Sequence, residues 1–275
     1  MRFTKKALYP PRLKRGTGLA HKGGTAPFKG WLKRNKFMPQ VPELLELLKA
    51  GVHFGHQQSR WHPKMAPFLF GVRNGVHVID LEETQKKLAL ALAFLKQSAA
   101  EGKIILFVGT KDQAKEIVQK FAVACEMPYV SERWLGGLLT NYTTINALLK
   151  KFRKLKADQA SGELAAKYTK SEVTKFGKYI QKMEKTLSGL VYLERKPDVL
   201  FLIDIKKEKT ALREAIATGV KTVAFCDSNV NPEAIDYIIP ANDDASKSIE
   251  LITRLAAEAV KEGKAQAHQL TNAAA

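Results

Sequence analysis

The stretch IILFVGTKDQAKEIVQKFAVAC, residues 104–125, decides the fold. Its first part, residues 104–110, is a continuous apolar run, which is typical of a β-strand covered on both faces. Residues 111–125 repeat apolar side chains at helical spacing, which predicts an amphipathic helix. A buried strand that leads directly into a helix is the repeating unit of α/β proteins, so this stretch predicts an α/β fold.

The same unit recurs on both sides of this stretch. We expect further strands at residues 76–81, 128–134, 198–204, 220–227 and 236–240, and helices at residues 42–50, 82–102, 208–218 and 244–262. Asp243 or Asp244 is expected to be the N-cap of the last helix. The alternation predicts a doubly wound, mostly parallel sheet with right-handed crossovers.

One segment, residues 142–190, interrupts this alternation. It contains two apolar series that step by three and four residues: Ile145, Leu148, Leu149, Phe152 and Leu155, then Val173, Phe176, Ile180, Met183, Leu187 and Leu190. Thr169 and Glu172 have the spacing of a capping box before the second series. The two series predict an antiparallel helical hairpin, a small coiled coil inserted into the α/β body.

The net charge is unevenly distributed along the chain. The 45 Lys and Arg residues exceed the 27 Asp and Glu residues, so the formal charge is +18. Residues 1–42 contribute +11 and contain no acid, residues 146–196 contribute +8, and the rest carries −1. Two concentrated basic segments on a neutral body favour binding to a polyanion, and nucleic acid is the preferred one.

These patterns divide the chain into four parts. We expect a basic extended arm at residues 1–42, an α/β body at 43–141 and 191–263, the hairpin at 142–190 and a C-terminal tail at 264–275. The arm is expected to run over RNA or an adjacent protein, although its lack of acids is also typical of organellar transit peptides. No apolar run is long enough to span a bilayer, so no membrane partner is expected. Cys125 and Cys226 are expected to be buried free thiols.

Three histidines lie in GVHFGHQQSRWHPKM, residues 51–65, which is expected to be a shaped loop. Asp204 and Asp227 fall at the carboxyl ends of two expected strands, where α/β sheets gather ligands. Together with His56 they form a candidate site for a divalent metal ion. The alternative is that both aspartates cap the helices or turns that follow them.

Two glycine-containing turns are further candidates. VGTK, residues 108–111, joins a strand to a helix, where Lys111 would meet a phosphate, although a turn that simply needs Gly109 is the alternative. In RWLGGLLTN, residues 133–141, the glycines shape a turn and Arg133 is expected to point outward. An enzyme or binding protein for a phosphorylated small molecule, using Lys111, Asp204 and Asp227, is therefore the alternative function. No catalytic motif supports it.

Several motifs resemble one known family. They are AGVHFGH (50–56), WHPKMAP (61–67), VHVIDL (76–81), FVGTK (107–111), RWLGGLLTN (133–141), PDVLFLID (197–204) and IPANDDA (239–245). In colinear order over residues 43–263, they are similar to small ribosomal subunit protein two of the bacterial type. Residues 1–42 exceed the short N-terminus that is usual in that family.

The resemblance implies a flavodoxin-like, five-stranded sheet with an inserted coiled-coil hairpin. It also implies a structural, non-enzymatic role on small-subunit ribosomal RNA, beside neighbouring ribosomal proteins that include the large mRNA-recruiting one. The expected location is the cytoplasmic ribosome, with an organellar ribosome as the alternative. No cofactor is required, and a divalent metal ion is the one candidate.

Basic and aromatic residues of the loop, the turns, the hairpin and the arm are the expected RNA contacts. They are Arg60, Trp61, His62, Lys64, Lys111, Arg133, Lys150, Lys151, Arg153, Lys154, Lys178, Lys182, Arg12, Lys14, Arg15, Lys33 and Arg34.

Overall fold

The computed structural model describes residues 41–274. Its strands are β1 (Phe54–Gln57), β2 (Leu69–Arg73), β3 (Val76–Ile79), β4 (Ile105–Val108), β5 (Tyr129–Val130), β6 (Val199–Leu202), β7 (Lys221–Cys226) and β8 (Tyr237–Pro240). Its α-helices are α2 (Leu44–Lys49), α3 (Leu81–Ala100), α4 (Asp112–Ala124), α5 (Tyr142–Ala160), α6 (Glu163–Lys167), α7 (Lys170–Leu187), α8 (Lys209–Thr218) and α9 (Ser246–Ala274). The predictions for the arm up to residue 40, including Arg12, Lys14, Arg15, Lys33 and Arg34, lie outside the described residues.

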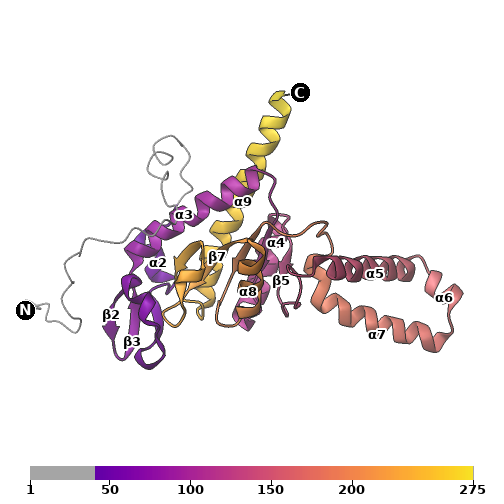
Figure 1. Ribbon diagram of the computed structural model, residues 1–275, viewed down its shortest axis with the longest axis horizontal. Helices are drawn as coiled ribbons and strands as arrows, with labels where there is room; N and C mark the ends of the chain where they lie inside the picture. Colours follow the sequence, from indigo (N-terminus) through magenta and orange to yellow (C-terminus); the bar gives the residue numbers. More distant parts are fainter. Residues whose placement is uncertain (1–40, 275) are drawn as a thin grey trace, which may run out of the picture. The chain divides into compact units, whose positions relative to one another are not determined.

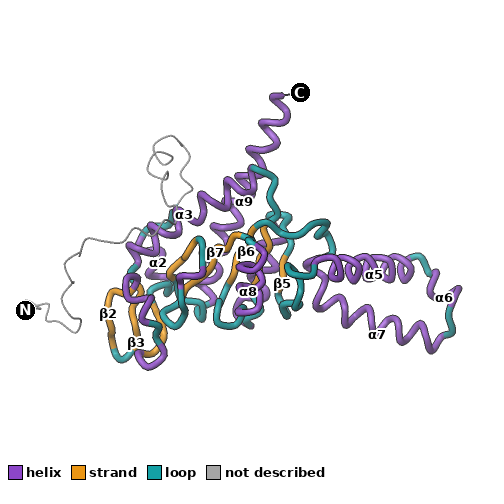
Figure 2. The backbone as a smooth tube through the Cα atoms, in the orientation of Figure 1, coloured by secondary structure: helices purple, strands orange, loops and turns teal. Residues whose placement is uncertain are grey.

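Five parallel strands form the central sheet in the order β5-β4-β6-β7-β8 (Figure 2). The central ladder pairs Ile105 with Val199 and Val108 with Leu202. The predicted α/β class and the five-stranded parallel sheet are therefore confirmed.

Alternate side chains of the central strands enter two hydrophobic cores, because successive residues of a strand point to opposite faces. On one face, Ile105 and Phe107 pack in a core with residues of α3, α4 and α9. On the other, Leu106 and Val108 share a core with residues of α8 and the base of the hairpin. Both faces are covered, which explains the uninterrupted apolar run of β4.

The strand at residues 76–79 belongs to a different sheet from the one expected. β3 pairs antiparallel with β1 and β2 in a three-stranded sheet. Its inclusion in the strand–helix alternation was wrong, and so was the treatment of residues 51–65 as a loop throughout, because Phe54–Gln57 is a strand. The pairing is irregular, with register shifts on both sides of β3. Short, irregular strands leave little periodicity to read.

The hairpin at residues 142–190 consists of α5 and α7, with the short helix α6 in the segment expected to be a loop (Figure 1). The buried side chains of α5 and those of α7 belong to one hydrophobic core: Ile145, Leu149 and Phe152, then Ile180, Met183 and Leu187. The Thr169–Glu172 capping box is present at the start of α7. The helical hairpin is thus observed, and its supercoiling stays a prediction.

Two glycines permit close helix packing. A Cβ on Gly109 would lie 2.8 Å from the Val118 side chain, so this glycine lets α4 approach β4. A Cβ on Gly263 would lie 2.2 Å from the Lys96 carbonyl oxygen, so this glycine lets α9 cross α3. The last helix was expected to end at residue 262, but α9 continues through the predicted tail to Ala274. The sequence after Gly263 has no proline to stop it.

The two cysteines are buried free thiols, as expected. Burial raises the pKa of the Cys125 thiol to about 11, because the charged thiolate loses hydration. Within residues 41–274, no helix combines the length and the apolar character that crossing a membrane requires.

Candidate functional site: a carboxylate crevice and a basic surface

Charged side chains converge where the strands of the central sheet end. Lys111 follows β4, Asp204 follows β6, Asp227 follows β7, and Asp243 follows β8. His56 reaches the same place from β1, the strand of the smaller sheet. Parallel strands end at one edge, so topology brings Lys111 and the three aspartates together, while the smaller sheet adds His56. We call this charged cluster the crevice.

Lys111 is the cation at the centre of this crevice. Its Nζ lies 2.8 Å from Asp243, 2.6 Å from Asp244 and 3.5 Å from Asp204, and 14% of the side chain is exposed. The ammonium group is therefore already compensated by carboxylates of its own chain. This geometry does not favour the phosphate contact that we predicted for Lys111.

His56 is held between two carboxylates. Its Nδ1 lies 3.1 Å from Asp227 Oδ2, at ion-pair distance but without good hydrogen-bond geometry, and its Nε2 lies 3.6 Å from Asp244 Oδ2. The Asp227 carboxylate raises the pKa of His56. Asp227 itself is 1% exposed and accepts a hydrogen bond from the Ser228 hydroxyl at 3.0 Å.

The two neighbouring aspartates titrate differently. Burial, together with the nearby Asp227 charge, raises the pKa of Asp243 to about 7. Asp244 is more exposed, and although burial opposes its ionisation, the hydrogen bond from Lys111 lowers its pKa. Burial disfavours the Lys111 ammonium, but its hydrogen bonds to Asp243 and Asp244 outweigh burial and raise its pKa.

The structure changes the predicted metal-ligand set. His56, Asp227, Asp243 and Asp244 each place one ligand atom within 4.8 Å of the others. Asp204 lies outside this set, and its Oδ1 accepts a hydrogen bond from the Lys207 N–H at 3.1 Å, which is the turn-capping alternative.

Asp243 and Asp244 were predicted to cap the last helix, and neither does. The side chain of Asn242 instead stabilises the turn before the helix, because its Oδ1 accepts from Asp244 N at 2.8 Å and from Ala245 N at 3.3 Å, both ahead of the first helical residue, Ser246. The signal that pointed to Asp204 and Asp227, a carboxylate directly after a buried strand, applies equally to Asp243 after β8.

The segment after β1 presents a mixed surface. Arg60 is exposed, and Lys64 forms an ion pair with Glu233. The ring of Trp61 packs on His77, with centroids 5.1 Å apart, and His62 Nδ1 accepts from the Lys64 N–H at 3.3 Å. Of the four predicted RNA contacts here, Arg60 and Lys64 are thus exposed, while Trp61 and His62 are half-buried.

The RWLGG turn is organised by a residue that sequence reasoning missed. The buried carboxylate of Glu214 on α8 accepts from Trp134 Nε1 at 3.1 Å, Gly137 N at 2.8 Å and Leu139 N at 3.0 Å. Burial opposes ionisation, but the hydrogen bonds from Leu139 and Gly137 hold the pKa of Glu214 below its usual value. Arg133 is exposed, as expected.

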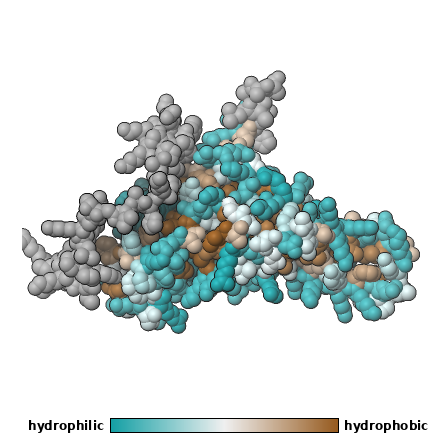
Figure 3. All heavy atoms as spheres, viewed as in Figure 1, coloured by the Kyte–Doolittle hydropathy of each residue, from teal (hydrophilic) through white to brown (hydrophobic). Residues whose placement is uncertain are grey.

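Most of the predicted hairpin contacts are open to solvent. Lys150, Lys151, Lys154, Lys178 and Lys182 are all exposed. In Figure 3, hydrophilic residues border the hairpin, with apolar residues between its helices. Arg153 differs, because its guanidinium donates to the carbonyl oxygens of Val191 at 2.5 Å and Leu193 at 3.1 Å. Arg153 therefore fastens the base of the hairpin.

An exposed apolar surface, the α2–β2 face, lies on α2 and the three-stranded sheet. Phe70 is 81% exposed, Leu45 is 56% exposed and Phe54 is 53% exposed. Leu44, Leu48 and Phe70 also line a cavity of about 420 Å³. Contiguous exposed apolar side chains of this kind mark contact sites for other proteins.

The sequence also matches known proteins. The family model described as Ribosomal protein S2 matches residues 47–263. Three bacterial relatives, each called small ribosomal subunit protein uS2, are similar over most of their length. The protein of Coprothermobacter proteolyticus is 45% identical over 82% of this chain and 83% of its own. The protein of Geotalea uraniireducens is 47% identical over 79% of this chain and 85% of its own. The protein of Fusobacterium nucleatum is 45% identical over 81% of this chain and 90% of its own.

The fold, the exposed lysines of the hairpin and these matches define the class as a ribosomal protein, which is structural and not enzymatic. More particularly, the chain belongs to the ribosomal protein S2 family of the small ribosomal subunit, in its bacterial type. The alternative of an enzyme for a phosphorylated small molecule is thereby set aside, in agreement with a crevice whose lysine is already paired.

Proposed function

We propose that this constituent of the small subunit binds small-subunit ribosomal RNA mainly through the exposed lysines of its hairpin. The observation that carries the proposal is that α5 and α7 each have two different faces. Their apolar residues pack in one core, while five lysines face solvent. Solvated lysines pair with phosphates and release counterions, so affinity falls as salt rises. Arg60 and Arg133, both exposed on the body, are further candidates for phosphate contacts.

The test is the salt dependence of binding between the full chain and purified small-subunit RNA. Replacing Lys150, Lys151, Lys154, Lys178 and Lys182 by glutamine should flatten the plot of log K against log salt by about 0.7–0.9 for each phosphate that the protein no longer neutralises. The matched control is Lys221→Gln, because Lys221 is exposed but paired with Asp236 at 2.7 Å. An unchanged slope in the five-lysine variant would refute the proposal.

We further propose that the α2–β2 face receives a neighbouring small-subunit protein, and that this neighbour is the large mRNA-recruiting one to which the family resemblance points. The exposure of Phe70 supports an apolar contact, since burying a phenylalanine contributes about 1.5–3 kcal/mol. Phe70→Ser should weaken binding of that purified protein to the full chain. Ile216→Ser is the control, because the Ile216 side chain on α8 is 56% exposed. Equal affinities of the two variants would contradict the assignment.

The crevice supports a third proposal, a divalent cation held by His56, Asp227 and Asp244. An imidazole together with carboxylates suits a transition metal such as Zn²⁺ or Mn²⁺. Because the pKa of His56 is raised, the cation competes with a proton and should bind more tightly as pH rises. Elemental analysis of the purified protein and its thermal stabilisation by Zn²⁺ test this proposal. The His56→Asn variant should lose both the bound metal and the stabilisation. A wild-type protein with no metal and no stabilisation would exclude the site.

We place the protein on ribosomes of the bacterial type in the cytoplasm, with an organellar ribosome as the alternative. The support is that all three relatives come from bacteria. Sedimentation of the protein with small subunits from its source cells, in high salt, tests this placement.

A further inference from the structure

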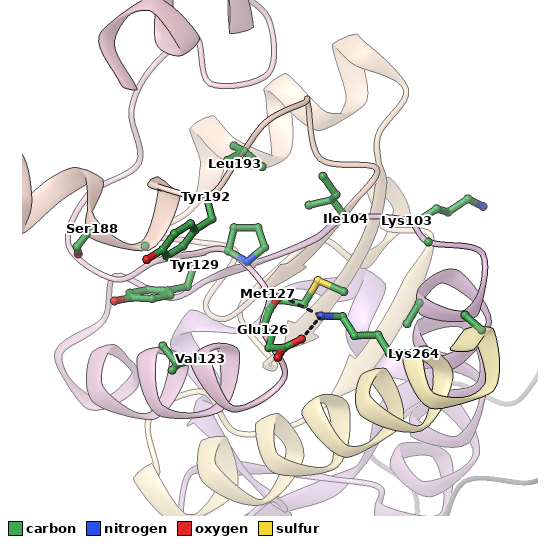
Figure 4. A pocket seen from close by; sticks show the side chains of 15 residues that line it. Lys103, Ile104, Val123, Glu126, Met127, Tyr129, Ser188, Tyr192, Leu193 and Lys264 are labelled. Atoms are coloured by element: carbon green, nitrogen blue, oxygen red, sulfur yellow. Dashed lines mark hydrogen bonds and ion pairs between the residues drawn. The ribbon is translucent and has the colours of Figure 1, made fainter. Parts of the chain in front are cut away.

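A second large cavity lies at the opposite end of the central sheet from the crevice. It has a volume of about 830 Å³, within the range of about 300–1,000 Å³ that ligand pockets show. Its wall comes from the starts of β4 and β5, the base of the hairpin and the end of α9. Ile104, Met127 and Leu193 give it an apolar lining (Figure 4).

An unusually exposed aromatic ring lies at this cavity. Tyr192 is 91% exposed, the highest exposure among the large apolar residues identified as exposed in residues 41–274. Tyr129 lines the same cavity. An exposed tyrosine over an apolar hollow offers a flat ring on which an unpaired nucleobase can stack, and such stacking is how proteins hold single-stranded RNA.

A paired acid and base lie in the same cavity. Lys264 Nζ donates to the Glu126 carbonyl oxygen at 3.0 Å and lies 3.4 Å from Glu126 Oε2. The Glu126 side chain is 85% exposed, so its carboxylate remains open to a further partner. Glu126 also has φ of 54°, because it follows the C-cap of α4, where its N–H and that of Met127 donate to the carbonyl oxygens of Val123 and Ala122.

This pair complements the edge of one base in particular. The ammonium group donates to an acceptor, and the adjacent carboxylate accepts from two neighbouring donors. Guanine presents O6 as the acceptor, followed by N1–H and the N2 amino group as donors, whereas adenine offers the carboxylate a single donor group. Lys103, the other cation of the cavity, is paired with Glu101 at 2.6 Å, so the lining holds no unbalanced charge cluster that would favour phosphate instead of a base.

We propose that this cavity binds an unpaired guanine of RNA, with its ring against Tyr192 and its Watson–Crick edge on Glu126 and Lys264. The inference rests on the proposed RNA-binding function and adds a base-specific contact to the phosphate contacts of the hairpin. Tyr192 supplies affinity for any base, and the Glu126–Lys264 pair selects guanine.

The experiment compares the full chain with three fluorescent hexanucleotides, hexaadenylate and its derivatives with one central guanosine or one central inosine. Their phosphates are identical, so the basic segments bind all three equally. We expect the guanosine oligonucleotide to bind at least about 5-fold more tightly than hexaadenylate. The affinity for the inosine form, which lacks the N2 amino group, should lie between the affinities for the other two. Equal affinities for all three would overturn the proposal.

Variants separate the two roles. Glu126→Gln should abolish the preference for guanosine. Tyr192→Ala should weaken the binding of all three oligonucleotides, and Tyr192→Phe should bind them as the wild type does. Tyr168→Ala is the matched control, since Tyr168 is exposed on the hairpin outside this cavity. A guanosine preference that survives Glu126→Gln would also overturn the proposal. Binding of wild-type protein to small-subunit RNA is measured in parallel. It shows whether a negative result contradicts only the guanine site or the proposed RNA-binding function as well.

Discussion

The indole N–H of Trp134 donates to the Glu214 carboxylate at 3.1 Å, across 80 residues of sequence. The same carboxylate accepts from the backbone N–H groups of Gly137 and Leu139. One buried acid on α8 therefore holds the turn from which the hairpin departs. Gly137 has φ of 89° in this turn, a left-handed conformation that glycine adopts without cost.

Glu214→Ala should lower the free energy of unfolding by about 3 kcal/mol, because several buried donors lose their acceptor at once. Urea unfolding followed by tryptophan fluorescence measures the change. Glu194→Ala, at an exposed position, is the control and should leave the midpoint in place. A Glu214→Ala midpoint equal to that of wild type would show that water replaces the carboxylate.

Two glycine substitutions in helices should have opposite effects. Gly263→Ala places a methyl group 2.2 Å from the Lys96 carbonyl and should destabilise the fold by about 1–3 kcal/mol. Gly177→Ala in α7 meets nothing within 4 Å and should stabilise it by about 0.5–1 kcal/mol. Thermal unfolding of the two variants checks the signs, and a shift of the same sign in both would contradict the packing described for α3 and α9.

Neighbouring basic residues of α5 should separate stability from RNA binding. Arg153→Gln removes hydrogen bonds to Val191 and Leu193 and should lower the unfolding midpoint, with little effect on the salt slope of RNA binding. Lys154→Gln should do the reverse, because Lys154 is exposed. Unfolding curves and RNA titrations on both proteins test this. If only Arg153→Gln reduced the salt slope of RNA binding, Arg153 would be the RNA contact and Lys154 would not.

The buried histidine of β3 should make stability depend on pH. His77 is 1% exposed, neither ring nitrogen has a hydrogen-bond partner, and burial lowers its pKa from the usual 6.5. The unfolded chain therefore binds a proton that the folded chain rejects, so stability falls as pH drops below about 6.5. His77→Phe should reduce this loss, though not abolish it, since burial also lowers the pKa of His53. Unfolding midpoints between pH 5 and 8 measure it, and identical pH profiles for variant and wild type would rule it out.

The central sheet and the hairpin were predictable because their signals are local. The unbroken apolar run of β4 and the three-and-four spacing around Ile180 each specify one element. The small sheet was not predictable in this way. β1 contains Gly55, at which a Cβ would lie 2.9 Å from the Ser228 hydroxyl, and that packing comes from a residue far away in the sequence.

The candidate site was only half predictable for the same reason. The position of Asp227 follows from the strand ends that meet at one edge of the parallel sheet, whereas His56, which lies beside it as expected, comes from antiparallel β1. That Lys111 would be neutralised by Asp243 and Asp244 depends on the side-chain geometry of two loops. The role of Glu214 depends on distant backbone N–H groups, which leave no trace in the spacing of residues.

The pairing of β4 with β6 also orders events during synthesis. Ile105 meets Val199 only after the intervening chain, the whole hairpin included, has been made. The helices of the hairpin close through local contacts, which form fast, whereas the central ladder must wait for a distant strand. The apolar face of β4 therefore leaves the ribosome well before its partner, and the nascent protein has a period of aggregation risk that ends when β6 arrives.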